Sequence, residues 1–292
     1  MTHLIRVVVS GLGSGAIYAM VALGFVLVYR GTKVINFAQG EYVMVGGVVA
    51  GAVYEAFDVH ILIPIVAGLS AGLFAGLLTQ VLVSSTRRAR DNPHLVTLVT
   101  IGFAVALKAA VMVTTDRQTY QLPGFTNRIP ITVAGATVNG QVLLNVTMMA
   151  VSAVLLMLFF RYTRRGLWLR ATADDPETAE AYGVSSTGSF LWSFGLAGLL
   201  GGLVGIGLTP LALISFDSGT LLGLKGFSAA VIGGLASPAG AIIGGLILGL
   251  AEAFVAGYGP SAYADVVAFV ALLGILLARP TGIFREVSVD RV

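Results

Sequence analysis

The sequence predicts an all-α polytopic membrane protein, a bundle of about eight transmembrane helices with one short helix outside the bilayer. Of its 292 residues, 57% are hydrophobic and only 11% are charged, and the mean hydropathy is +0.92. Soluble domains carry roughly 25% charged residues, so this composition indicates a chain that crosses a membrane several times. Its apolar runs are continuous and reach the length of about 20 residues that a spanning helix needs. A transmembrane β-barrel is excluded, because its strands alternate apolar and polar residues.

Eight apolar runs mark the expected spans, at residues 7–29, 42–57, 61–83, 94–115, 141–160, 189–211, 225–257 and 263–278. The chain has 38 glycines, and many of those in the apolar runs stand four residues apart, as at Gly68, Gly72 and Gly76. Small residues at that spacing let helix backbones approach closely in lipid. We therefore expect tight packing within one bundle, with contact to a second membrane subunit as the alternative.

Basic residues set the expected orientation, because cytoplasmic loops carry an excess of Lys and Arg. The basic connections contain Arg30 and Lys33, then Arg87, Arg88 and Arg90, and then the segment Arg161–Ser189. The C-terminal tail with Arg279, Arg285 and Arg291 is expected in the cytoplasm as well. Counting back through the spans places the N-terminus outside.

The path of the glycine-rich run 225–257 decides whether the segment 161–189 and the C-terminal tail can both be cytoplasmic. These two assignments conflict if the run crosses the membrane once, and they agree if it enters and leaves on one side. Pro238 disfavours helical geometry at Ser237, and a break is tolerated where it is buried in protein or lines a cavity. We predict two short helices, broken near Ala236-Ser237-Pro238.

The segment 161–189 is too polar for a bilayer, because four arginines are followed by four acids: Arg161, Arg164, Arg165, Arg170, Asp174, Asp175, Glu177 and Glu180. Asp175 can cap a helix with Pro176 at its first position, and Gly183 is a stop signal. A helix of two turns is not stable alone in water. We expect it to dock, either on the membrane face of its own chain or, as a coupling helix, in a soluble partner.

Five segments in order resemble the permeases of ABC importers for branched-chain amino acids, the LIV type and its amide and urea relatives. The segments are Gly15–Gly24, Val34–Glu41, Arg170–Gly183, Ala230–Gly245 and Arg279–Phe284. Each alone is a weak signal, but together they cover nearly the whole chain. The sequence departs from the family at Gln39, where histidine is usual, and glutamine still donates and accepts hydrogen bonds.

The resemblance implies one permease domain over residues 1–292, in a bacterial inner membrane, with a cytoplasmic coupling loop at about 161–188. It implies two permeases, which the resemblance favours as related but different chains, two ATP-binding subunits and a periplasmic substrate-binding protein. ATP hydrolysis would occur on those partners. The family's coupling segment, which seats in a groove of the ATPase, matches Asp174, Asp175, Pro176, Glu177, Thr178, Ala179, Glu180, Ala181, Tyr182 and Gly183. The substrate is expected to be a branched-chain amino acid or a related small amide or urea.

A second segment, Asn36–Glu41, precedes the second apolar run. Asn36 can cap that span, and Glu41 would lie near its positive end. Transporters often bind substrate where broken helices present such ends to a cavity. We therefore predict that Asn36, Gln39 and Glu41 line the translocation pathway, with an ordinary surface loop as the alternative. Thr97 and Thr100 are further candidates, although such hydroxyls more often bond to backbone.

Four charges lie within or near the ends of apolar runs: Lys108, Lys225, Glu252 and Asp265. Charge inside a membrane is costly and by default indicates function. For these residues the sequence leaves a pathway role and a structural role open.

Other functions fit less well. A stand-alone secondary transporter or channel for a small polar solute would need intramembrane acids or histidines, and it leaves the cytoplasmic helix unexplained. Gly13-Ser14-Gly15 superficially suggests a hydrolase nucleophile, but the three histidines that could activate it, His3, His60 and His94, fall at or near loop ends. The chain has no phosphate-binding loop and no cysteine. We expect no catalytic residue, metal, cofactor or nucleic acid.

Overall fold

The structure is a computed structural model that describes residues 2–86, 93–126, 131–133, 136–279 and 282–284. Within these ranges the helices are α1 Thr2–Thr32, α2 Gln39–Phe57, α3 Leu62–Ser85, α4 Pro93–Thr114, α5 Gly140–Tyr162, α6 Arg164–Asp174, α7 Pro176–Ala181, α8 Ser186–Leu208, α9 Ser218–Gly233, α10 Pro238–Tyr258 and α11 Ala264–Ala278. Strands β1 (Ile131–Val133) and β2 (Ala136–Val138) form an antiparallel hairpin, and a 3-10 turn covers Ser261–Tyr263. The predicted loop residues Arg87, Arg88 and Arg90 and tail residues Arg285 and Arg291 lie outside the described residues.

The predicted all-α polytopic fold is confirmed, and each of the eight apolar runs contains a helix. In the described part of the chain, 7 helical segments are long and apolar enough to cross a membrane: α1, α3, α4, α5, α8, α10 and the turn-plus-helix Ser261–Ala278. Two of the apolar runs, 42–57 and 225–257, also contain helices that are not among these candidate spans, α2 and α9. The first begins with Gln39 and Glu41, and the second has only 16 residues.

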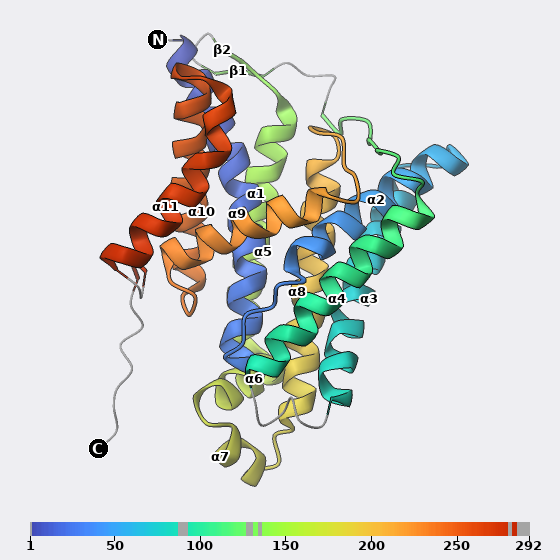
Figure 1. The fold of residues 1–292 in the computed structure, drawn as a ribbon, viewed down its shortest axis with the longest axis vertical. Coiled ribbons are helices and arrows are strands. Elements are labelled where there is room, and N and C mark those ends of the chain that lie inside the picture. The colour runs from blue at the N-terminus through green and yellow to red at the C-terminus, as the bar shows by residue number, and fades with distance from the viewer. Residues whose placement is uncertain (1, 87–92, 127–130, 134–135, 280–281, 285–292) are drawn as a thin grey trace.

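Helix α1 is the centre of the bundle (Figure 1), with α10 and α11 on one side and α2, α3 and α4 on the other. Its apolar window is 89% buried, against 17% for α4 and α5. Helix α10 runs antiparallel to α1 along almost its whole length, with Gly249 against Gly15 and Gly245 against Ala19. The glycines at four-residue spacing therefore pack helices within one bundle, as expected.

The same device joins α3 to its neighbours. Gly68 lies against Gly46 of α2, while Gly72 and Gly76 lie against the backbone of α8 at Gly198 and Phe194. Carbonyl oxygens there would stand within 2.5 Å of an added Cβ atom. Only glycine allows backbones this close, so the glycines of α3 stand four residues apart because each one contacts a neighbouring backbone.

Substitution at the α1–α10 contact should be costly. A Cβ atom at Gly249 would stand 2.2 Å from the backbone nitrogen of Gly15, so Gly249→Ala is expected to lower the free energy of unfolding by about 3 kcal/mol, the upper end of ordinary overpacking. A Cβ atom at Gly102 of α4 meets nothing within 4 Å, and Gly102→Ala should stabilise by up to about 1 kcal/mol through helix propensity. Thermal unfolding of the two purified variants checks this, and equal midpoints would contradict it.

The break in the run 225–257 lies where the sequence predicts it. Helix α9 ends at Gly233, Gly234 follows with φ 107°, and Ser237 caps α10 by accepting from the Gly240 nitrogen at 3.0 Å. Pro238 occupies the first helical position, where its missing N–H does no harm. The expectation of two short helices is corrected in one respect: α10 has 21 residues and is a candidate span of full length.

The route of the chain around this break agrees with the charge assignments. The backbone nitrogens of Ile283 and Phe284, beyond α11, donate to the carbonyls of Ile232 and Gly233 at 2.9 and 3.1 Å. The end of α9, the start of α10 and the end of α11 therefore share one end of the bundle. From there α10 returns alongside α1.

Helices α2 and α9 both begin inside the bundle. After α1 ends, the chain turns back, so that the side chain of Gln39 lies against Gly24, about two turns before the end of α1. The start of α9 meets it there, since Gly40 packs against the Gly219 carbonyl and Gly223. Two helix N-termini thus face each other within the membrane-spanning body.

Candidate functional site

A cavity of about 310 Å³ lies where α1, α2, α4 and α9 meet. Its walls are mostly apolar, and its charged members are Glu41 and Lys108; the full lining is Phe25, Phe37, Glu41, Ile101, Ala104, Val105, Lys108, Gly219, Thr220, Gly223, Leu224 and Phe227. Of the five predicted pathway residues, only Glu41 lines this cavity. Lys108, whose role the sequence left open, lines it too.

Glu41 stands in the first turn of α2 and is only 4% exposed. Its Oε1 atom accepts a hydrogen bond from the Thr220 hydroxyl at 3.1 Å, and that hydroxyl accepts from Lys108 Nζ at 3.2 Å. Thr220 therefore connects the acid of α2 to the base of α4. The Oε2 atom of Glu41 is buried against Gly219 and has no hydrogen-bond partner among the described residues.

Asn36 and Gln39 are fully buried but bond to the protein itself. Asn36 Oδ1 accepts from the Ala38 nitrogen at 3.1 Å, its Nδ2 donates to the Tyr42 hydroxyl at 3.2 Å, and Gln39 Nε2 donates to the Ala197 carbonyl at 3.1 Å. The expectation that Asn36 caps the second span is wrong, because the cap position is Ala38 and carries no side-chain bond. Asn36 instead closes the turn that leads the chain back into the bundle.

Thr100 is also fully buried, on α4. Its hydroxyl donates to the Thr97 carbonyl at 2.8 Å and accepts from the Phe37 nitrogen at 3.3 Å. For Thr100 the expected bonding to backbone is thus confirmed. Thr97 lies half-buried one turn earlier. The Thr100 hydroxyl ties α4 to the turn that precedes α2.

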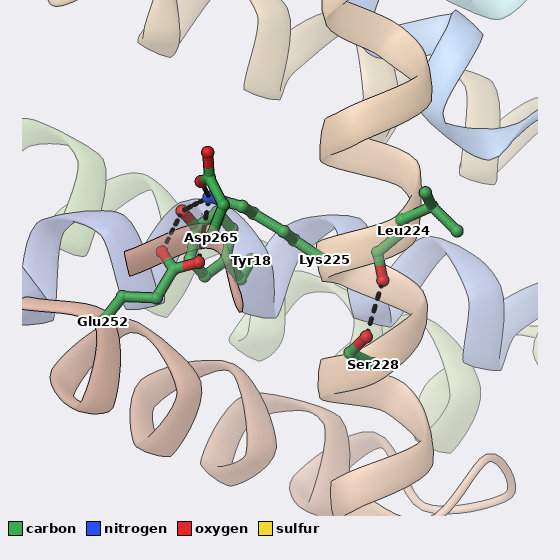
Figure 2. A network of polar contacts seen from close by, with 6 residues as sticks. All are labelled: Tyr18, Leu224, Lys225, Ser228, Glu252 and Asp265. Carbon is green, nitrogen blue, oxygen red and sulfur yellow. Dashed lines mark hydrogen bonds and ion pairs between the residues drawn. The ribbon is translucent and has the colours of Figure 1, made fainter. Parts of the chain in front are cut away.

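The remaining intramembrane charges form one network on the far side of α9 (Figure 2). Lys225 Nζ lies 2.9 Å from Glu252 Oε1 and 2.7 Å from Asp265 Oδ1, and it donates to the Tyr18 hydroxyl at 3.2 Å. Tyr18 donates in turn to Glu252 Oε2 at 2.6 Å. Four helices, α1, α9, α10 and α11, meet at these four side chains.

This network connects α9 to its neighbouring helices, next to the cavity. Leu224 and Phe227 of α9 line the cavity, whereas Lys225 between them points to the network. The ion pairs thus fix the helix that carries Thr220. Tyr18 was missed from the sequence, because a tyrosine in a long apolar run gives no signal of charge.

The predicted helix between Pro176 and Gly183 is confirmed as α7, which begins at Pro176 and ends at Ala181. Asp175 caps it: its Oδ1 accepts from the Thr178 nitrogen at 3.1 Å and its Oδ2 from the Thr178 hydroxyl at 2.5 Å. These bonds, the hydroxyl bond first, lower the pKa of the Asp175 carboxyl below its usual value. Gly183 has φ 82°, the left-handed conformation that favours glycine after a helix.

Helix α6 precedes α7, and the sequence had indicated only a loop there. The Thr163 hydroxyl caps it by accepting from the Gly166 nitrogen at 2.9 Å. Helix α7 contacts α6 and α8, and Ala179 is the single buried residue of Asp174–Gly183. Tyr182 is 86% exposed. The helix projects at one end of the molecule (Figure 1) with its acids accessible.

Comparison with known proteins decides the family. A family model described as "Branched-chain amino acid transport system / permease component" matches residues 7–276. The chain belongs to this family. The permease is 32% identical to the high-affinity branched-chain amino acid transport system permease protein BraD of Pseudomonas aeruginosa, over 99% of this chain and 98% of that protein. It is 30% identical to LivH of Salmonella typhimurium, over 97% and 96% of the two chains.

A more distant relative confirms the match. The probable branched-chain amino acid transport permease protein LivH of Methanocaldococcus jannaschii is 27% identical, over 90% of this chain and 87% of that protein. Among solved structures, PsaBC from Streptococcus pneumoniae in complex with Fab matches with a TM-score of 0.50 and 13% identity, covering 96% of this chain and 93% of that chain. This likeness concerns the fold alone.

The resemblance seen in the sequence is therefore confirmed. The permease is a transport subunit rather than an enzyme, and a multi-pass protein of the inner membrane. The family match favours this interpretation over a stand-alone transporter or channel.

Proposed function

We propose that this permease forms the membrane pathway of an ATP-driven importer for branched-chain amino acids. The observation that carries the proposal is α7: a capped, acidic helix of 6 residues that presents all but one of its side chains to solvent. So short a helix has little stability of its own, and its exposed acids fit a soluble partner better than a lipid surface. The coupling segment in this proposal is Asp174–Gly183.

The proposed partners follow from the family. Relatives such as BraD and LivH are named as permease proteins of high-affinity branched-chain amino acid transport systems. For this chain we infer a second, related permease, two ATP-binding subunits that hydrolyse ATP and hold α7, and a periplasmic substrate-binding protein. Residues 1–292 act as one domain, with the loop 161–188 in the cytoplasm. Uptake of a small amide or urea is the second candidate for the substrate.

The pathway of this importer is the cavity between α1, α2, α4 and α9. Glu41 lies in its wall, and Asn36, Gln39, Thr97 and Thr100 position the turn and the helix around it. Movement of the ATPase would shift α7 and, through α6 and α8, bias the bundle between outward-open and inward-open states. A motor can do this only if it binds the two states with different free energies.

Uptake by the assembled transporter tests the proposal. The permease is expressed with the subunits encoded beside it and reconstituted in proteoliposomes that enclose ATP. We expect uptake of labelled leucine, isoleucine and valine that falls at least roughly tenfold without ATP, or when the phosphate-loop lysine of the ATPase is replaced. Acetamide and urea should not compete. Equal uptake without nucleotide would establish a stand-alone carrier.

A further inference from the structure

The cavity described above combines one acid, one base and an apolar wall. Glu41 and Lys108 are separated by the Thr220 hydroxyl, which bonds to both. Phe25, Val105 and Phe227 are among the side chains of the apolar wall. A cavity of about 310 Å³ is at the lower end of the size range of small-molecule sites. It therefore fits a small ligand with an apolar body and two opposite charges.

The Glu41 carboxylate is held ready for a positively charged ligand group. It stands in the first turn of α2 and against Gly219, the second residue of α9, so the positive ends of two helices offset part of the cost of burying its negative charge. Buried polar atoms are nearly always hydrogen-bonded, yet Oε2 has no such partner among the described residues. An ammonium group can supply up to three donors for that oxygen.

Lys108 supplies the opposite charge at a matching distance. One of its three donors goes to Thr220, and its Nζ lies 5.9 Å from the centre of the Phe216 ring. Because one hydroxyl bonds to both Lys108 and Glu41, the two charges stand only two hydrogen bonds apart. The amino and carboxylate groups of an α-amino acid, which share one carbon, can bridge that separation.

We propose that this cavity binds the zwitterion of an apolar α-amino acid. Glu41 Oε2 accepts from the ligand's ammonium, Lys108 pairs with its carboxylate, and its side chain packs on Phe25, Val105 and Phe227. This inference rests on the proposed function and assigns substrate contacts to the permease itself. A neutral amide or urea would leave both protein charges unmatched, so the same site selects against it.

Photo-leucine, a leucine with a diazirine in its side chain, tests the site in the complete reconstituted transporter. We expect crosslinks to the apolar wall, mapped by mass spectrometry to α4 and α9 near Val105 and Phe227. Glu41→Gln and Lys108→Met should each reduce this labelling roughly tenfold or more, because a hydrogen bond to a charged group is worth at least that factor. Lys108→Arg should retain labelling, and so should Glu55→Gln at the exposed end of α2.

Competitors separate the two contacts. Leucinamide lacks the carboxylate and 4-methylpentanoate lacks the ammonium, so in the wild type both should displace photo-leucine far less well than leucine does. In Lys108→Met, leucinamide should compete as well as leucine, and in Glu41→Gln, 4-methylpentanoate should do so. Co-elution of each variant with its partner subunits, together with its melting temperature, shows that it has folded.

The outcomes distinguish this inference from the proposed function. If the wild type accumulates leucine but labelling maps elsewhere, or survives in both variants, the zwitterion site is wrong while the importer stands. If the wild type accumulates no branched-chain amino acid, the proposed function fails and the site fails with it. Should a variant not fold, Ala104→Trp, which enlarges a half-buried residue of the cavity lining without changing a charge, must still abolish the labelling.

Discussion

Reversing the charge of α7 with Asp175→Lys, Glu177→Lys and Glu180→Lys is expected to abolish ATP-dependent uptake while the permease still inserts into the membrane. These three acids are exposed, and the one buried residue of α7 is Ala179. Replacing them by lysine does not change the helix bundle, but it puts positive charges where the partner surface is expected to bind negative ones. Uptake in proteoliposomes and co-purification of the ATPase measure the effect, and both should be lost together.

The cap and the charge of α7 need separate variants, because Asp175 supplies both. Asp175→Asn keeps an N-cap side chain and removes the charge, whereas Asp175→Ala removes both. Glu177→Lys with Glu180→Lys leaves the cap intact. If the partner recognises a preformed acidic helix, Asp175→Ala and the double variant should impair uptake more than Asp175→Asn does.

The matched control is Glu55→Lys, an exposed acid at the opposite end of the bundle, which should leave uptake unchanged. A crosslinker placed at Tyr182, which is 86% exposed, should capture the ATP-binding subunit. Wild-type uptake in the triple variant, with crosslinks from position 182 only to lipid or to the permease itself, would remove the coupling role of α7.

Local patterns in the sequence were sufficient to predict much of this fold. Continuous apolar runs located the helices, Pro238 located the break, and the Asp175-Pro176 step located α7, because each signal lies within a few adjacent residues. The spacing of Gly68, Gly72 and Gly76 likewise predicted close packing. In each case the deciding energy is local: hydrophobic length, a proline clash or a cap.

The candidate site was less accessible, because it depends on contacts between distant segments. Asn36 and Gln39 were predicted to line the pathway, but their amides bond to Tyr42 and Ala197. Thr220 has no local signal at all, since its importance lies in joining Glu41 to Lys108. Helix α6 escaped notice because its arginines suggested an open loop.

The charges that the sequence left undecided now separate into two groups. Lys108 lines the cavity, whereas Lys225, Glu252 and Asp265 join with Tyr18 on the opposite side of α9. Lys225 and Glu252 are buried, with side chains 9% and 8% exposed, and Asp265 is 60% exposed. Glu252 therefore depends most on the lysine, because Asp265 can be solvated instead.

Lys225→Met is consequently expected to lower the free energy of unfolding by about 3–5 kcal/mol, the usual cost of stranding one partner of a buried ion pair. Glu252 would keep only the Tyr18 hydroxyl, and α9 would lose its polar side-chain contacts with α1, α10 and α11. Unfolding of the purified permease in lipid bicelles, followed by the fluorescence of Trp168 and Trp192, measures the loss. Glu252→Leu should cost less, because Lys225 keeps Asp265.

Combined variants separate the cost of stranding a charge from the value of the pair. Replacing Lys225, Glu252 and Asp265 together by Met, Leu and Asn should recover most of the stability, since apolar groups of similar volume often replace buried ion pairs without loss. Lys108→Met is the matched control, because that lysine has no buried ion-pair partner among the described residues. If Lys225→Met is no less stable than Lys108→Met, the network does not hold α9 in place. The position of Thr220 would then depend on backbone packing, such as that of Gly40 on Gly219 and of Gly226 on Val21.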